Sequence, residues 1–530
     1  MEGTTTSISA SPLMRRRIAF WCAIVVLGVF GCGCVLAYIF AGRLRALVFE
    51  RTERYLESEL QSSVQASDFH VSSLYPRVHI TLDRVVLRHQ SREDLPPLVQ
   101  MSRVRFEANI LSLMRPRPVV DSVELEGLQI SVPPRRSGSS PLVERPQGNL
   151  AAKYPVTIRA IRADDAVLRI LPRDPARAPR EFHLHQLELR SVDIDRPATF
   201  RASLTNPVPT GEIETSGTFG PWNADNPAAT PVVGDYVFRH ADLQTLKGLR
   251  GILSSTGKFS GPLDYLEVSG STDVRDFGLR TSERPVALHT DFSAIVDGTN
   301  GNTILKQVLA RFLDAKLDVN GEVVDKTPKH GRTVLLNAVV EQAPVEDFLV
   351  LAVDSHPPVM TGTARIRAQV LVSEGSADII DRLTLSGQFD ISRAQFTSDE
   401  TERKIDALSL RGEGKPRELP TGYPPTEFAG RFRMANGVVN FSKLDFKVPG
   451  ASVALTGTYN LDSEQLDFRG KLQLAATLSE TTTGVKSLLL KAVDPFFKGR
   501  NAGTVLPIRI TGNKQNPSFA LDFRDKLDRE

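Results

Sequence analysis

Apolar and polar residues alternate along most of the chain, with the period of a β-strand. Residues 363–372 read TARIRAQVLV, with an apolar side chain at every second position, and residues 383–391 and 466–474 repeat the pattern. Successive side chains of a strand point to opposite faces of the sheet. Each of these strands therefore has one apolar and one wet face, which is typical of antiparallel sheet.

Shorter alternating runs extend the pattern to residues 78–82, 123–132, 184–189, 313–319 and 519–523. Dipeptides that favour hairpin turns occur at residues 297–298, 300–301, 320–321 and 436–437. Stretches rich in proline, glycine or arginine, predicted to be long loops, cover residues 133–155, 171–180, 206–231 and 412–426. Helical breaks in this pattern are few and short; one is predicted at 242–249 and another at 344–353, where Pro344 suits a first helical turn. The predicted fold class is mainly β, an elongated antiparallel sheet with a few short helices.

Residues 18–40 interrupt this pattern with a run that carries no charge. At 1.5 Å per residue, a helix of this length spans a hydrocarbon core of roughly 30 Å. Three adjacent arginines at 15–17 precede it on a short tail, as in a signal anchor. We therefore predict a single-pass transmembrane helix over 18–41, with the N-terminus in the cytoplasm. Its anchoring residues are Ile18, Phe20, Trp21, Val25, Leu27, Leu36 and Phe40.

Two alternatives for this segment stay open. A cleaved signal peptide needs a small-x-small site, and none ends the run well. Val29-Phe30-Gly31-Cys32 resembles a lipoprotein processing site, but apolar sequence continues past Cys32.

Two segments have helical periodicity. Residues 42–66 are predicted to be an amphipathic linker helix, with Leu44, Leu47 and Tyr55 among Glu and Arg. Residues 484–497 carry an apolar stripe beside Lys486 and Lys491. This second helix either plugs the end of a sheet or rests on a lipid surface or a partner.

These segments divide the chain into five parts: a cytoplasmic tail (1–17), the transmembrane helix (18–41), the linker helix (42–66), a sheet body with long loops (67–427) and a C-terminal region (428–530).

Cysteine usage places the body in an oxidising compartment. The three cysteines, Cys22, Cys32 and Cys34, all lie in the apolar run, and none follows it. A body without thiols avoids wrong disulfides outside the cytoplasm. It also excludes a cysteine-based zinc site or a cysteine nucleophile there. A net charge of +3, with no basic block outside the N-terminus, argues against nucleic-acid binding.

No motif in the chain carries catalytic chemistry. There is no P-loop, no G-x-S-x-G elbow and no G-x-G-x-x-G between a strand and a helix. His183 and His185 would share one face of a strand, but no H-E-x-x-H pattern accompanies them. We expect no catalytic residue, no metal and no cofactor. The alternative is an anchored hydrolase whose triad is formed only by the fold.

The apolar face of the sheet must either be buried against other parts of the protein or be exposed as a binding surface. Two facing sheets would form a closed sandwich, whereas one curled sheet would form an open trough that solvates acyl chains. Alternation does not choose between them, nor does it say which face curls inward, because a register error of one residue exchanges the faces. The candidate lining residues, or core residues of a sandwich, are Phe432, Met434, Val453, Leu455, Leu466, Phe468, Leu472, Leu474, Phe519 and Leu521.

Several longer stretches resemble one protein family. The N-terminal part reads LYPRVHITL at 74–82, LSL at 111–113 and VVDSVELEGLQISV at 119–132. Further matches are GTFGPWNADNPAATPVVGDYVFRHADL (217–243), IVDGTNGNT (295–303), FKVPGASVALTGTYNL (446–461), LSETTTGVKSLLLKAVDPFFK (478–498) and LPIRITGNKQNPSFALDF (506–523). Over nearly its whole length the chain resembles the AsmA-like family of gram-negative bacterial inner-membrane proteins.

The resemblance implies a β-taco groove in the periplasm, lined with apolar side chains and held by an inner-membrane anchor. It also implies passage of phospholipid between the two membranes, or an influence on outer-membrane protein assembly. We therefore expect a lipid-binding or lipid-transfer protein whose partners are membrane phospholipids and other envelope proteins, with no nucleic acid. The alternative is a non-enzymatic scaffold for outer-membrane proteins that binds strands at an open sheet edge.

Overall fold

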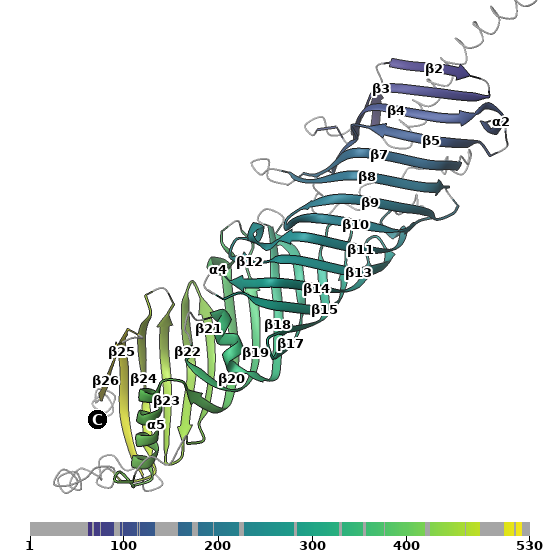
Figure 1. The fold of residues 1–530 in the computed structure, drawn as a ribbon. Coiled ribbons are helices and arrows are strands. Elements are labelled where there is room, and N and C mark those ends of the chain that lie inside the picture. Colours follow the sequence, from purple (N-terminus) through teal and green to yellow (C-terminus); the bar gives the residue numbers. More distant parts are fainter. Residues whose placement is uncertain are drawn as a thin grey trace, which may run out of the picture.

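The computed structural model shows one long, curled β-sheet that runs the length of the molecule (Figure 1). It describes residues 62–521 except 66–67, 75, 90–95, 98, 114, 116, 133–156, 172–178, 194, 222–226, 280–283, 328–330, 353–356, 376, 419–423, 462, 478–502 and 514–515. The mainly β character predicted from the alternation is thus confirmed.

The strands of the first half are β1 (Ser62–Gln65), β2 (Asp68–Leu74), β3 (Arg77–His89), β4 (Val99–Asn109), β5 (Val119–Glu126), β6 (Gln129–Val132), β7 (Thr157–Ile170), β8 (Arg180–Val192), β9 (Ala198–Pro207), β10 (Thr210–Phe219), β11 (Pro231–Asp242), β12 (Leu249–Arg250) and β13 (Ile252–Pro262). Those of the second half are β14 (Leu266–Leu279), β15 (Val286–Val296), β16 (Thr303–Phe312), β17 (Ala315–Thr327), β18 (Gly331–Pro344), β19 (Met360–Val372), β20 (Leu383–Phe396), β21 (Glu427–Ala435), β22 (Val438–Val448), β23 (Ala451–Asn460), β24 (Gln465–Leu474), β25 (Thr504–Asn513) and β26 (Asn516–Leu521). The helices are α2 (Ile110–Leu113), η2 (Pro227–Ala229), η3 (Leu243–Leu246), α3 (Val345–Ala352), α4 (Ile379–Arg382) and α5 (Asp399–Gly412).

From β7 onward the sheet is an antiparallel meander in which each strand pairs with the next, except that β11 pairs directly with β13 and β12 pairs with β14. Near the N-terminal end the sheet is mixed, because β5 and β6 both run parallel to β7. The prediction of a wholly antiparallel sheet is therefore wrong there. Parallel pairing needs a crossover of a dozen residues or more, and the chain between β6 and β7 (133–156) is long enough for one.

Several local predictions need correction. The loop predicted at 206–231 contains all of β10, which pairs along its length with β9 and β11. Its alternation is weak because most of its side chains are small or polar. The turn predicted at 320–321 lies inside β17, where a Cβ on Gly321 would meet the Leu335 carbonyl oxygen. Residues 62–65, assigned to the linker helix, form β1 and pair with β3.

Other predictions are confirmed or refined. Helix α3 forms at the break predicted over 344–353, and the break at 242–249 holds the short 3₁₀ helix η3. Asn436 and Gly437 both have positive φ, 51° and 72°, as a hairpin turn of this kind requires. Helix α5 was not predicted, although Ser398 caps its N-terminus and Gly412 ends it.

The predicted transmembrane helix (18–41), the rest of the linker helix and the predicted helix at 484–497 lie outside the described residues. Within the described ranges, the structure has no helix long and apolar enough to cross a membrane.

Doublets of exposed polar residues bend the strands. They stand at Arg239–His240 in β11, Arg275–Asp276 in β14, Glu341–Gln342 in β18, Ser392–Arg393 in β20 and Ser442–Lys443 in β22. At each doublet the ladder to one neighbouring strand shifts by one residue, which is a β-bulge; that neighbour is the next strand except for β20, where it is β19. A bulge bends its strand and increases the local twist. The repeated bulges thus help to explain how a single sheet of this length curls.

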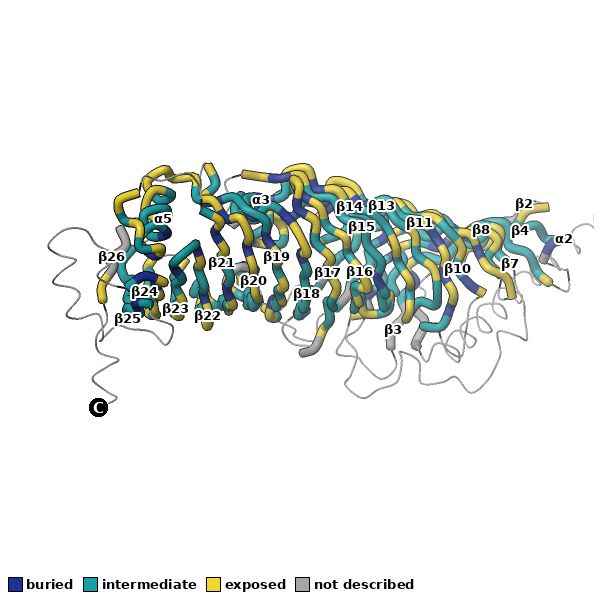
Figure 2. The backbone as a smooth tube through the Cα atoms, turned by 90° about the horizontal axis from the view of Figure 1, so that it is seen from below, coloured by how far each residue is buried: buried dark blue, intermediate teal, exposed yellow. Residues whose placement is uncertain are grey.

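The best-buried residues lie along one long edge of the second half of the sheet. Helices α3 and α5 follow β18 and β20, which end at that same edge (Figure 2). Phe348 of α3 meets Phe312 edge-on at 5.4 Å and packs on a cluster with Val340 and Ala343. Ile405 of α5 packs with Val448, Ala451 and Leu474. The two helices therefore cover one margin of the apolar face, and no other helix of the described residues covers the rest of it.

Candidate functional site

The strand registers place all ten predicted lining positions on one face of the sheet. Ladder partners share a face, and Leu472 lies opposite both Val453 and Leu506. The same holds where Met434 lies opposite Leu385, Leu455 opposite Leu444, and Leu466 opposite Tyr459. By its backbone register Phe519 is opposite Ile510, although its side chain lies outside what the structure describes. We call this surface the apolar face.

Phenylalanine rings form a continuous track across the apolar face from β20 to β24. Neighbouring ring centroids lie 5.3–6.4 Å apart along the series Phe396, Phe446, Phe428, Phe389, Phe432, Phe441 and Phe468. Only Phe432 and Phe468 were among the predicted lining residues. The other five stand at positions of the same face, so the alternation of β20, β21 and β22 was the signal that could have identified them.

Glycines make room for these rings. Phe389 lies opposite Gly430, and Phe432 lies opposite Gly387. A Cβ on Gly430 would stand 2.7 Å from two atoms of the Phe389 ring. Gly234 stands in the same relation to Phe259 farther along the sheet. The Phe389 and Phe259 rings therefore each cover a neighbouring strand at a position where a larger residue would clash with the ring.

The apolar face has no second sheet packed on it in the described part of the chain, since all described strands belong to one sheet. Leu474, which packs with Ile405 of α5, is 7% exposed, and Phe468, towards the other end of β24, is 6% exposed. By contrast, Phe432, Met434, Val453, Leu455, Leu466 and Leu472 are only half-buried, and Leu521 is exposed. A closed sandwich would bury these positions. The arrangement is that of one curled sheet with an accessible apolar face.

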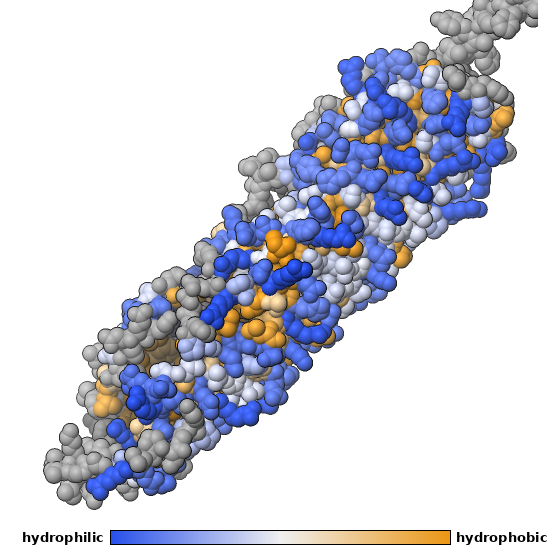
Figure 3. All heavy atoms as spheres, in the orientation of Figure 1, coloured by the Kyte–Doolittle hydropathy of each residue, from blue (hydrophilic) through white to orange (hydrophobic). Residues whose placement is uncertain are grey.

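The surface view shows the same contrast. Hydrophobic residues gather in the middle of the face shown in Figure 3, around the level of β14, β15 and β18, and hydrophilic residues surround them. Monomeric proteins rarely expose large contiguous apolar patches, and those that persist usually mark binding sites.

Loops from opposite long edges of the sheet meet in front of this region. The chain after β11 (η3, β12) leaves one edge, and the chain between β19 and β20 (α4) leaves the other. The backbone N–H of Ile379 donates a 3.2 Å hydrogen bond to the carbonyl of Lys247, and Gly248 packs on the Asp378 carboxylate. β12 and α4 lie next to each other in Figure 1. We call this contact the loop bridge.

The polar residues flagged in the sequence form ordinary surface contacts. The His185 ring nitrogen Nε2 lies 2.7 Å from the Thr205 hydroxyl, and no carboxylate of the described residues forms an ion pair with it. Among the described residues there is no group of three or more His, Cys, Asp or Glu side chains that could hold a metal ion. The exposed side chains of the apolar face could bind an apolar ligand.

Comparison of the chain with protein-family models, with curated proteins and with solved structures gave no match in any of the three.

Proposed function

We propose that this chain is an inner-membrane-anchored periplasmic protein that binds phospholipid along its apolar face and passes it towards the outer membrane. The observation that carries the proposal is the apolar face itself, one sheet thick, continuous across neighbouring strands and only half-buried. The uncharged run at 18–40 and the cysteine-free body support the anchor and the compartment. The likeness to the AsmA-like family supports the same assignment.

The mechanism would be passive. Each buried methylene contributes about 0.8 kcal/mol relative to water, so an acyl chain gains on the order of 10 kcal/mol from a continuous apolar surface. Movement along the face costs little if each position offers a similar burial. The phenylalanine track and its neighbouring Leu and Val residues meet that condition from β20 to β24. The charged headgroup would stay in water beside the apolar face.

A photo-crosslinking amino acid placed in the full-length protein in cells tests the proposal. At position 455, on the apolar face of β23, it should capture phospholipid that mass spectrometry identifies. At position 456, the exposed neighbour on the polar face, it should not. Equal capture at both positions, or none at either, would contradict the proposal.

A charge-insertion pair completes the test. Leu455→Asp with Leu466→Asp should abolish the crosslink from a neighbouring apolar position. Thr456→Asp with Gln465→Asp, on the same strands but the polar face, should leave it unchanged.

The scaffold alternative has its own structural observation. Among the described residues, the last strand β26 pairs only with β25, and an unpaired strand edge can accept a further strand. Charges on the apolar face would spare pairing at that edge. A lipid crosslink lost without loss of envelope function would therefore favour the scaffold over transfer.

A further inference from the structure

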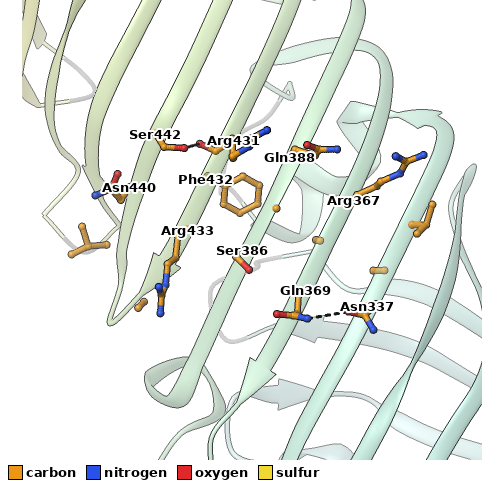
Figure 4. A pocket seen from close by; sticks show the side chains of 16 residues that line it. Asn337, Arg367, Gln369, Ser386, Gln388, Arg431, Phe432, Arg433, Asn440 and Ser442 are labelled. Atoms are coloured by element: carbon orange, nitrogen blue, oxygen red, sulfur yellow. Dashed lines mark hydrogen bonds between the residues drawn. The ribbon is translucent and has the colours of Figure 1, made fainter.

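The polar face of the sheet, opposite the apolar face, contains a recess of about 890 Å³ between β18 and β22 (Figure 4). Its polar side chains are those of Asn337, Arg367, Gln369, Ser386, Gln388, Arg431, Arg433, Asn440 and Ser442. We call it the arginine recess. Its volume lies in the range of pockets that bind small molecules, roughly 300–1,000 Å³.

Two ladder rows build the centre of the recess. In one row, Gln388 lies opposite both Arg367 and Arg431, and in the next, Ser386 lies opposite Gln369 and Arg433. Ser386 is the short member, so longer side chains surround its hydroxyl. Arg367 and Arg431 are two strand spacings apart, about 9.5 Å, and Arg431 and Arg433 are about 7 Å apart along one strand. In Figure 4 the guanidinium groups of Arg367 and Arg433 point away from each other, so these flexible side chains would have to turn inward for all three to contact one ligand.

The lining of the recess carries an excess of positive charge, whereas the carboxylates of Glu341, Asp390 and Asp445 line an adjoining hollow that shares Arg367, Gln388 and Arg431 with it. Three arginines and no Asp or Glu line the recess itself. In the part of the chain that the structure describes, neither Arg431 nor Arg433 forms an ion pair. Arg367 approaches Glu341 only to 3.8 Å, and both side chains are largely exposed. Such a pair is weak, so the Arg367 guanidinium is readily drawn to another anion.

Amide groups on one side of the recess are held in place. The Gln369 side chain donates to Asn337 at 3.2 Å, and Asn337 donates to Asn320 at 3.1 Å. This line of amides crosses three strands and gives the recess fixed polar groups beside its arginines. Amides and hydroxyls bond to ligand hydroxyls, whereas guanidinium forks match the paired oxygens of phosphate.

We propose that the arginine recess binds a phosphate group carried on a sugar or a polyol. The three guanidiniums would hold the phosphate, and Gln369, Gln388, Asn440 and Ser386 would bond to the hydroxyl-bearing body. The site does not depend on the proposed lipid transfer, because it lies on the other face of the sheet. A phosphosugar of a glycan and the headgroup of an anionic phospholipid share this chemistry.

Calorimetric titration of the full-length protein in neutral detergent tests the proposal, with glucose 6-phosphate, glucose and inorganic phosphate as probes. Glucose 6-phosphate should bind at least about tenfold more tightly than either of the others, because both halves of the ligand are recognised. Arg431→Gln with Arg433→Gln should weaken the binding of glucose 6-phosphate by about tenfold or more, the effect of one lost charged hydrogen bond.

The matched control is Arg469→Gln with Lys471→Gln, which removes the same charge from exposed positions of β24 outside the recess. The affinity of this control variant for glucose 6-phosphate should stay at the wild-type value. Equal loss in the two double variants would overturn the proposal and leave only a diffuse basic surface. Inorganic phosphate binding as tightly as glucose 6-phosphate, or no binding at about 10 mM probe, would also overturn it.

Phosphatidylglycerol added to the detergent micelles shows whether the bound phosphate belongs to a lipid headgroup or to a phosphosugar. Competition with glucose 6-phosphate would assign the site to a lipid headgroup. Absence of competition would assign it to a soluble or glycan phosphosugar, and either result supports the shared chemistry.

Discussion

Asp347 fastens the rim helix α3 to the turn between β16 and β17, and its removal should loosen that turn. Asp347 is 7% exposed, and its Oδ2 accepts a 2.9 Å hydrogen bond from the backbone N–H of Asp314. Leu313, the preceding residue, has φ +49°, an unfavourable conformation for a leucine. The turn thus depends on a contact made by a distant residue.

Two opposing effects set the size of the change. A hydrogen bond to a charged group contributes roughly 1.5–3 kcal/mol. Burial, followed by the negative charges of Asp314 and Glu346, raises the pKa of Asp347, so ionised Asp347 also costs stability. We therefore expect Asp347→Ala to weaken the turn by a net of about 1–2 kcal/mol. Asp347→Asn keeps an acceptor oxygen without the charge, and should change the stability by less than about 0.5 kcal/mol.

Hydrogen exchange of a peptide covering residues 310–316 measures the effect locally. Asp347→Ala should speed exchange of the Asp314 amide by about 5- to 30-fold, the factor that 1–2 kcal/mol predicts. Asp325→Ala, an exposed carboxylate of β17, is the control and should change nothing. Wild-type exchange rates in Asp347→Ala would refute the reasoning.

The pH dependence has a definite sign. Because the folded pKa of Asp347 is raised, the folded state binds its proton more tightly than the unfolded state does. The stability of the turn should fall as pH rises from the unfolded pKa through the folded one. Asp347→Asn should lack this dependence.

Three further perturbations test other parts of the fold. Gly430→Val should destabilise the sheet by about 1–3 kcal/mol by striking the Phe389 ring, whereas Ala429→Val on the polar face should not, and equal melting temperatures would contradict the packing argument. The hydrogen bond from His289 to Asp273 raises the pKa of His289. The protonated His289 therefore stabilises the folded state below the unfolded pKa of about 6.5, and this stabilisation is lost as pH rises through the folded pKa. His289→Gln should therefore lower the melting temperature more at about pH 5.5 than at about pH 8.5, and a shift independent of pH would rule this out. Lys247→Cys with Ile379→Cys should be joined by a short bis-maleimide in a body that has no other cysteine, whereas two reactive thiols that never link would disprove the loop bridge.

The face of each strand could be predicted from the sequence wherever alternation was uninterrupted, as in β24. It could not be followed through a bulge. At Ser442–Lys443 two polar residues stand in succession, so Phe441 and Leu444 share a face despite their odd spacing. The Asn320-Gly321 dipeptide has the composition of a turn, yet it lies in a strand, where a glycine is needed because a Cβ would clash with the Leu335 carbonyl oxygen.

The arginine recess could not be predicted, because Arg367, Gln388 and Arg431 become neighbours only once β19, β20 and β21 are paired in register. The loop bridge likewise depends on how the sheet curls. Helix α5 could have been predicted, since Ser398 followed by Asp399 and Glu400 has the composition of a helix start.

The meander also has a mechanical consequence. Its strands lie across the long axis, so the hydrogen bonds between them run along it, and a pull between the two ends would load every ladder in series. Such an array yields at its weakest ladder. Between β25 and β26 the structure records six paired positions, compared with ten between β24 and β25. The loop bridge joins the segment after β11 to the segment after β19, and so provides a parallel load path around the strands between them. Under tension the C-terminal margin should peel first, while the bridged middle stays intact.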